Sequence, residues 1–184
     1  MLWQFPPNLA FDRALLSDFL ALLPRDTATA SALARRRDPA IMRGRTATSI
    51  DQARPLRHAF EVRHASFMDD AFLDLLEAHG AALVAADAAA AWPYAEDVTA
   101  DFVYLRLHGA SELYASGYDE AALANWARRI RAWADGGQVD DAQTVRAAPP
   151  APRPREVFCY FDNDAKVRAP FDAQALMALL RAQH

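Results

Sequence analysis

The residues of this sequence that are best suited to chemistry lie at the end of an apolar stretch, residues 101–109. Tyr104, Arg106 and His108 share one face of the strand predicted there, because side chains of a strand alternate with a period of two. Gly109 then ends the strand, so Arg106 and His108 lie at its carboxyl end. Parallel α/β proteins place binding and catalytic groups at that end of their strands. We therefore expect a ligand site or a catalytic site here.

The rest of the chain is predicted to alternate strands and helices. Strands are predicted at residues 2–5, 58–64, 82–87, 101–109 and 157–161, and helices at residues 11–23, 70–79, 119–135 and after Pro170, with Asp172 as the last N-cap. This order implies parallel strands joined by right-handed crossovers, and the mostly apolar strand faces suit a sheet covered by helices. The prediction is an α/β fold, either an open doubly wound sheet or part of a (β/α)8 barrel.

Two charged or proline-rich segments enter strands rather than leave them. The arginine-rich segment 35–57, which includes Arg43 and Arg45, and the proline-rich segment 145–155 both precede a strand. Such segments lie at the amino ends of the strands, opposite the carboxyl ends where sites form, so they are poor candidates for the main site. We expect segment 25–56 to be partly helical or mobile, and its arginines to be solvated, with RNA or DNA contact as the alternative.

Length and composition restrict the class of protein. A chain of 184 residues with 53% hydrophobic and 24% charged residues is typical of one soluble domain. A formal net charge of -4 argues against a general nucleic-acid coat, and no apolar run reaches the roughly 20 residues of a membrane span. Cys159 is the single cysteine, which excludes an intrachain disulfide and makes the reducing cytoplasm the expected location. Glycine-rich phosphate loops, nucleophile elbows and dinucleotide fingerprints are absent from the sequence.

Five ordered motifs carry a resemblance to a known family. They are Leu2-Trp3-Gln4-Phe5-Pro6-Pro7, Glu61-Val62-Arg63-His64 with Ser66-Phe67, Asp87 with Trp92, Tyr104-Leu105-Arg106-Leu107-His108-Gly109, and Tyr160-Phe161-Asp162-Asn163-Asp164. Together, in this order and at these separations, they resemble the YecE-like family, also called domain of unknown function 72. The resemblance implies a (β/α)8 barrel whose biochemical activity is not established.

The resemblance also implies that this chain is the C-terminal portion of such a barrel. Family members carry roughly a hundred residues before the first motif, which hold the early strands of the barrel. The prediction is a partial TIM (β/α)8-like barrel, one domain over residues 1–184, with about five parallel strands, covering helices and the N-terminal strands missing. Five strands cannot close a barrel of eight, so the strand at residues 2–5 is expected to be an open edge that self-associates or needs a partner.

The candidate site residues share one property, since all lie within or just after the carboxyl end of a predicted strand. They are Gln4, Glu61, Arg63, His64, Asp87, Trp92, Tyr104, Arg106, His108, Asp162 and Asn163. In a parallel barrel these positions converge on the functional face. We predict catalytic roles for three of them, Glu61, His108 and Asp162, and substrate binding for the others.

The residue types favour chemistry on an anionic ligand. Glu61 and His108 form a candidate acid–base pair, while Arg63 and Arg106 suit the bidentate binding of phosphate or carboxylate. The first hypothesis is therefore a hydrolase-like or isomerase-like enzyme that acts on a phosphorylated or otherwise anionic, oxygen-rich small molecule. The sequence leaves two alternatives open: a non-catalytic binding protein for a phosphorylated metabolite or nucleic acid, and a truncated, inactive family member.

Other interpretations of the same residues also remain open. Glu61, Asp87, His108 and Asp162 carry oxygen and nitrogen donors, but arginines close by would repel a divalent metal, so a metal is an alternative and no cofactor is required. Glu61 and Asp162 would be the two carboxylates of a glycosidase if their separation allowed it. A buried network in which arginines and acids neutralise one another, without any catalysis, is the plainest alternative.

Overall fold

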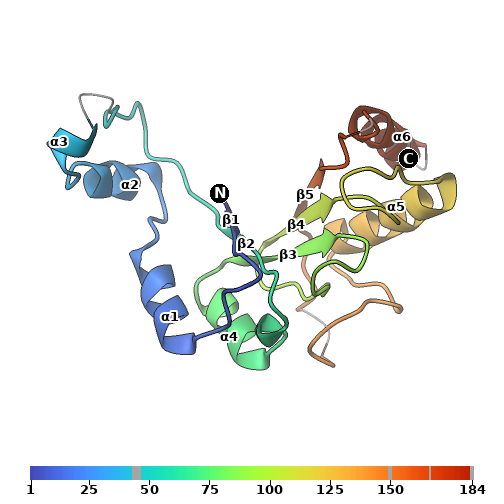
Figure 1. Ribbon diagram of the computed structural model, residues 1–184, viewed down its shortest axis with the longest axis horizontal. Helices are drawn as coiled ribbons and strands as arrows, with labels where there is room; N and C mark the ends of the chain where they lie inside the picture. Colours follow the sequence, from blue (N-terminus) through green and yellow to red (C-terminus); the bar gives the residue numbers. More distant parts are fainter. Residues whose placement is uncertain (43–46, 149–150, 166, 183–184) are drawn as a thin grey trace.

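Five parallel strands form one sheet in the computed structural model (Figure 1), which describes residues 1–42, 47–148, 151–165 and 167–182. The strands follow sequence order across the sheet: β1 (Leu2–Gln4), β2 (Ala59–Glu61), β3 (Ala82–Asp87), β4 (Phe102–Leu107) and β5 (Glu156–Phe161). Each neighbouring pair is parallel. The predicted α/β class and the predicted strands are therefore confirmed. The bounds differ most at β2, which was predicted over residues 58–64 and is observed over Ala59–Glu61.

The helices lie between these strands in the chain. They are α1 (Arg13–Leu22), α2 (Thr27–Ala34), α3 (Pro39–Met42), the 3-10 helix η1 (Ala65–Phe67), α4 (Asp70–Ala78), α5 (Glu120–Ala134) and α6 (Ala169–Arg181). Aspartates cap four of them, because the carboxylates of Asp12, Asp26, Asp69 and Asp119 accept hydrogen bonds from backbone N–H groups of the first turn. Among the described residues, no helix is both long and apolar enough to cross a membrane.

The prediction that Asp172 caps the last helix is wrong. Helix α6 begins three residues earlier, with Pro170 in its first positions, where the missing N–H of proline is tolerated. Asp172 lies in the first turn and is buried, and its carboxylate accepts hydrogen bonds from the backbone N–H of Tyr118 and from the side-chain amide of Asn163. The residue fastens α6 to the loop before α5.

Segment 25–56 is partly helical, as predicted, since it contains α2 and α3. Both helices stand apart from the sheet in Figure 1. An isolated β-bridge pairs Asp26 with Pro55 at the base of this arm. Arg43 and Arg45 of the arginine-rich segment lie outside the described residues.

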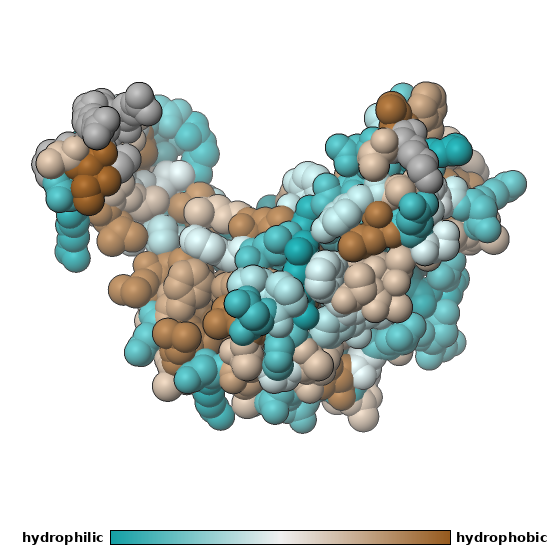
Figure 2. All heavy atoms as spheres, in the orientation of Figure 1, coloured by the Kyte–Doolittle hydropathy of each residue, from teal (hydrophilic) through white to brown (hydrophobic). Residues whose placement is uncertain are grey.

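The two faces of the sheet differ in what covers them. Helices pack on one face over apolar side chains that alternate along the strands, such as Phe60, Leu83, Leu105 and Cys159. The other face has a separate apolar cluster of small and aromatic side chains: Ala59, Ala82, Val84, Ala86, Ala100 and Phe102, with Tyr104 and Phe158 packed against it. This second face is partly open, because Tyr160 is 49% exposed at its rim. Figure 2 shows the molecule hollowed between the arm of α2 and α3 and the end that carries α5 and α6.

Candidate functional site

The carboxyl ends of three strands bring charged side chains to the open face of the sheet. Glu61 is the last residue of β2, Arg106 lies near the end of β4, and Asp162 follows β5 directly. The backbone N–H of Asp162 bonds to the carbonyl of Leu107 and thereby continues the register of β4 and β5 to His108. The period of two then turns these side chains to the same side as the small and aromatic cluster.

Glu61 is the centre of the resulting network. It is completely buried, and its Oε1 accepts hydrogen bonds from Nε of Arg63 at 3.1 Å and from Nη2 of Arg63 at 3.0 Å. Its Oε2 accepts a short hydrogen bond from Nη1 of Arg106 and lies 3.6 Å from Nε2 of His108. Three cationic or titratable side chains therefore share one buried carboxylate.

Gln4 and Asp162 connect the two arginines further. The amide oxygen of Gln4 accepts hydrogen bonds from Nη2 of Arg63 at 2.7 Å and from Nη1 of Arg106 at 3.2 Å. The carboxylate of Asp162 pairs with Nη2 of Arg106 through a short hydrogen bond. Because the Asp162 side chain is 38% exposed and that of Glu61 is completely buried, Asp162 is the carboxylate of the two that solvent reaches.

His108 lies between the two carboxylates and is completely buried. Its Nδ1 lies 3.1 Å from the Oδ2 of Asp162, yet neither ring nitrogen has a hydrogen bond of good geometry within the described residues. The ring of Tyr114 stands edge-on to the imidazole, with the centroids 5.4 Å apart, and its hydroxyl is 3.4 Å from Nη2 of Arg63. Tyr114 adopts a left-handed backbone conformation with φ +63°. The loop between β4 and α5 therefore closes over His108.

The network sets the charge state of Glu61. Burial alone raises the pKa of this carboxyl group, but the close contact with His108, the hydrogen bonds from Arg106 and Arg63 and the charge of Arg106 outweigh burial and lower the pKa to about 2. Glu61 is therefore ionised at neutral pH. A carboxylate of such low pKa is a weak base, so its contribution is to hold and orient its cationic neighbours.

The low pKa of Glu61 predicts a loss of stability in acid. Relative to an ordinary value of 4.5, the shift contributes about 3 kcal/mol to the free energy of unfolding. Because the pKa is lower in the folded state, this contribution is fully present above about pH 4.5 and is lost as the pH falls toward 2. Urea unfolding at several pH values should show a steeper decline in this window for the wild type than for Glu61→Gln. Parallel pH profiles of the two proteins would contradict this effect.

Two other predicted site residues lie beside the network. The guanidinium of Arg63 stands 4.4 Å from the ring centroid of Trp92, close enough for a cation–π contact. Tyr104 lies two residues before Arg106 on the same face and stacks on Tyr160 with the ring centroids 5.0 Å apart. The structure thus gathers eight of the eleven predicted residues: Gln4, Glu61, Arg63, Trp92, Tyr104, Arg106, His108 and Asp162.

Three predicted residues do not join the network. Asp87 follows the period of Leu83 and Ala85 and faces Tyr118 and α5, where burial raises the pKa of its carboxyl group although Tyr118 and the Ala89 backbone oppose the shift. Asn163 is buried, and its amide donates to Asp172 and to the carbonyl of Ser116. His64 instead caps the 3-10 helix η1, where its Nδ1 accepts from the backbone N–H of Ser66.

Tyr114 is the site residue that sequence reasoning missed. It lies in an irregular loop between Gly109 and Gly117, where no periodic pattern places a side chain. An aromatic residue in the loop that directly follows the strand of Arg106 and His108 was the available signal. Only the folded loop brings its ring to His108.

The donor atoms do not converge as a metal centre would require. Among the described residues no group of three or more histidine, cysteine, aspartate or glutamate side chains is placed to hold a metal ion. The oxygens of Glu61 are taken by Arg63 and Arg106, and Asp87 faces the other side of its strand. The four residues of the alternative metal interpretation, Glu61, Asp87, His108 and Asp162, are therefore not assembled as one ligand shell among the described residues.

Solved structures share this fold at low sequence identity. A DUF72 family protein from Thermotoga maritima superposes with a TM-score of 0.64 and 20% identity, over 97% of this chain and 56% of that one. A DUF72 family protein from Enterococcus faecalis gives a TM-score of 0.60 and 15% identity, over 100% of this chain and 58% of that one. The chain therefore spans little more than half the length of these two structures, and the shared fold is consistent with part of a barrel.

The family assignment rests on the whole length of the chain. No curated protein matches it. The model of the family described as protein of unknown function DUF72 matches residues 1–184. The resemblance noted from the five ordered motifs is thus confirmed, and the chain belongs to the DUF72 family, whose function is unknown.

Proposed function

We propose that this chain carries the catalytic face of an enzyme that acts on a phosphorylated or otherwise anionic, oxygen-rich small molecule. The single observation behind the proposal is His108, which is held between two carboxylates at the carboxyl ends of parallel strands, beside two arginines. Histidine is the side chain best suited to move a proton near neutral pH. A hydrolase-like or isomerase-like reaction needs such a proton transfer.

The carboxylates support His108 in this proposal. Glu61 and Asp162 lie 3.6 Å and 3.1 Å from the two ring nitrogens, so each is placed to orient the imidazole. Since the pKa of Glu61 is about 2, the proton-transfer role falls to His108 rather than to Glu61. Asp162 is partly exposed and is the carboxylate better placed to meet a ligand.

The arginines provide the proposed anion site. Nη1 of Arg63 makes no hydrogen bond within the part of the chain that the structure describes, which leaves it available to a ligand oxygen. Arg106 pairs with the partly exposed Asp162, and an incoming phosphate or carboxylate group competes with that carboxylate for the same guanidinium. Gln4 bridges both arginines and keeps them at one place on the face.

A specific observation favours a second candidate, a non-catalytic binding protein for a phosphorylated metabolite or nucleic acid. His108 is completely buried under Tyr114, and the two carboxylates balance the two arginines of the network. Such an arrangement also suits ligand recognition at its rim without turnover. The open edge of β1, which pairs only with β2 among the described residues, fits the further proposal of self-association or an inactive fragment.

A ligand screen tests the proposed function. The 184-residue chain is incubated with sugar phosphates, nucleotides and dicarboxylates, and both its melting temperature and the chemical fate of each compound are followed. The proposal expects at least one compound to raise the melting temperature and to be converted, and it expects the conversion to be lost in Arg63→Ala. Protection without conversion would favour the binding protein. Neither effect with any compound would contradict both candidates.

A further inference from the structure

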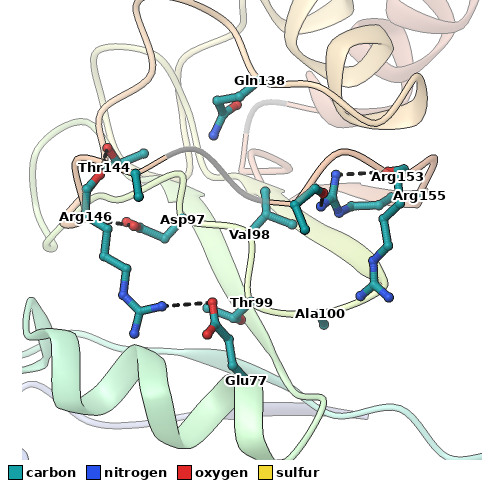
Figure 3. Close-up of a pocket in the computed structure, with 12 residues that line it drawn as sticks. Glu77, Asp97, Val98, Thr99, Ala100, Gln138, Thr144, Arg146, Arg153 and Arg155 are labelled. Atoms are coloured by element: carbon teal, nitrogen blue, oxygen red, sulfur yellow. Dashed lines mark hydrogen bonds and ion pairs between the residues drawn. The ribbon is translucent and has the colours of Figure 1, made fainter.

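A cavity lies at the amino ends of the strands, whereas the candidate site lies at their carboxyl ends. The cavity has a volume of about 460 Å³, and its walls come from the end of α4, the loop that enters β4 and the loop that enters β5. Figure 3 shows Arg146, Asp97 and Glu77 on one side of this cavity and Arg153 and Arg155 on the other. The volume falls within the range of about 300–1,000 Å³ that small-molecule sites occupy.

The acidic side of this cavity is internally neutralised. Arg146 pairs with Glu77 at 2.8 Å, and also with Asp74 and Asp70. Both carboxylate oxygens of Asp97 accept backbone hydrogen bonds, from the N–H of Val145 and of Arg146. These carboxylates therefore have their own partners within the protein.

The opposite side of the cavity carries two arginines, Arg153 and Arg155, and no carboxylate of the described residues pairs with either of them. Arg155 is only 7% exposed, yet within the described residues neither it nor Arg153 forms an ion pair. Two of the five guanidinium N–H donors of Arg155 reach the carbonyls of Arg153 and Ala151, and its buried Nε has no partner. Burial and the neighbouring charge of Arg153 lower the pKa of Arg155. A buried cation with an unused donor is unfavourable unless an anion compensates it.

The backbone holds the two arginines in place. The N–H of Arg153 bonds to the carbonyl of Gly136, and the N–H of Arg155 bonds to that of Ala134, at the end of α5. Gly136 has φ +91°, and a Cβ atom there would lie 2.5 Å from the carbonyl carbon of Arg153. The absence of a side chain at Gly136 therefore allows the close approach that fixes the arginines beside the cavity.

From these observations we propose that this cavity binds the phosphate group of a small molecule through Arg153 and Arg155. Two uncompensated guanidinium groups match a phosphate monoester, which carries about -1.5 to -2 charges at neutral pH. The unused N–H groups of Arg155, including Nε–H, supply the charge-assisted hydrogen bonds that arginine forms with phosphate oxygens. The remaining volume, next to Val98, Ala100 and Gln138, accommodates the rest of the molecule.

Calorimetric titration of the 184-residue chain with inorganic phosphate tests this site. We expect Arg153→Ala, which removes an exposed side chain, to weaken phosphate binding about tenfold or more. The matched control Arg13→Ala makes the same charge change on the exposed surface of α1 and should leave the affinity unchanged. Arg155→Met should abolish binding, and if that variant unfolds, Arg153→Ala decides alone.

The same titration separates this site from the one proposed at the carboxyl ends of the strands. Arg63→Ala should retain phosphate binding at Arg153 and Arg155, whatever the function of the Glu61 network. Binding that is unchanged in Arg153→Ala, or that is lost only in Arg63→Ala, would overturn the proposal. A wild-type chain that binds no phosphate, or that responds equally to chloride at the same ionic strength, would overturn it as well.

Discussion

Replacing Glu61 with glutamine is expected to lower the free energy of unfolding by about 3–5 kcal/mol. The substitution keeps the shape of the side chain but removes the charge that Arg63 and Arg106 share at a completely buried position. His108 loses one of its two neighbouring carboxylates at the same time. Removing one partner of a buried ion pair leaves uncompensated charge in the interior, and that desolvation penalty is the source of the effect.

Urea unfolding of matched variants measures this expectation. The control is Glu156→Gln, because Glu156 also pairs with an arginine, Arg57, but its side chain is 68% exposed. An exposed ion pair contributes about 0–1 kcal/mol, so this control should be nearly as stable as the wild type. If Glu61→Gln unfolds at the same urea concentration as Glu156→Gln, the buried network does not stabilise the fold.

Replacing His108 with glutamine is expected to lower turnover of the substrate found by the ligand screen by about 10²–10⁴-fold, the range typical of a lost general acid or base. Glutamine preserves hydrogen-bonding atoms but cannot transfer a proton at neutral pH. The side chains of Glu61 and Asp162 remain, so binding of the anion at the arginines should persist. The loss should therefore appear in kcat rather than in KM.

A second buried histidine provides the control for this experiment. His58 is only 6% exposed, and its ring bonds to Nε1 of Trp3 and to the carbonyl of Pro24, neither of which belongs to the network around Glu61. His58→Gln should alter stability but leave kcat within a few-fold of the wild type at temperatures where it is folded. Equal losses of kcat in both variants, or unchanged turnover in His108→Gln, would rule out the proton-transfer role.

The period of a strand explains how much of the site could be predicted. Glu61, Arg106 and Asp162 were expected at strand ends, and the structure brings them together because each lies an even number of residues from a side chain of the open face. Asp87, the last residue of β3, and Asn163, which follows β5, also lie at strand ends, but they are at odd spacing and face the helices. Position at a strand end was therefore insufficient without the period.

Local signals explain the accuracy of the helix predictions. Helix α5 was predicted to within a residue because an Asp119 cap, regularly spaced Leu123 and Trp126, and a Gly136 stop all agree. The arm of α2 and α3 was predicted only as partly helical, because its alanine-rich sequence lacks an amphipathic pattern. The position of the Tyr114 ring in the site depends on the tertiary path of the loop between β4 and α5, which no local sequence pattern encodes.

The central claim is that the network around Glu61 binds an anionic ligand, and nuclear magnetic resonance of the arginine Nε–Hε groups tests it most directly. The signals are assigned by substitution in the 184-residue chain and followed while the best phosphorylated compound of the screen is added. Our account predicts saturable shifts of the Nε–Hε signals of Arg63 and Arg106. The signal of Arg57, which pairs with the exposed Glu156, should not shift. Shifts confined to Arg153 and Arg155, or none at any arginine, would contradict the claim.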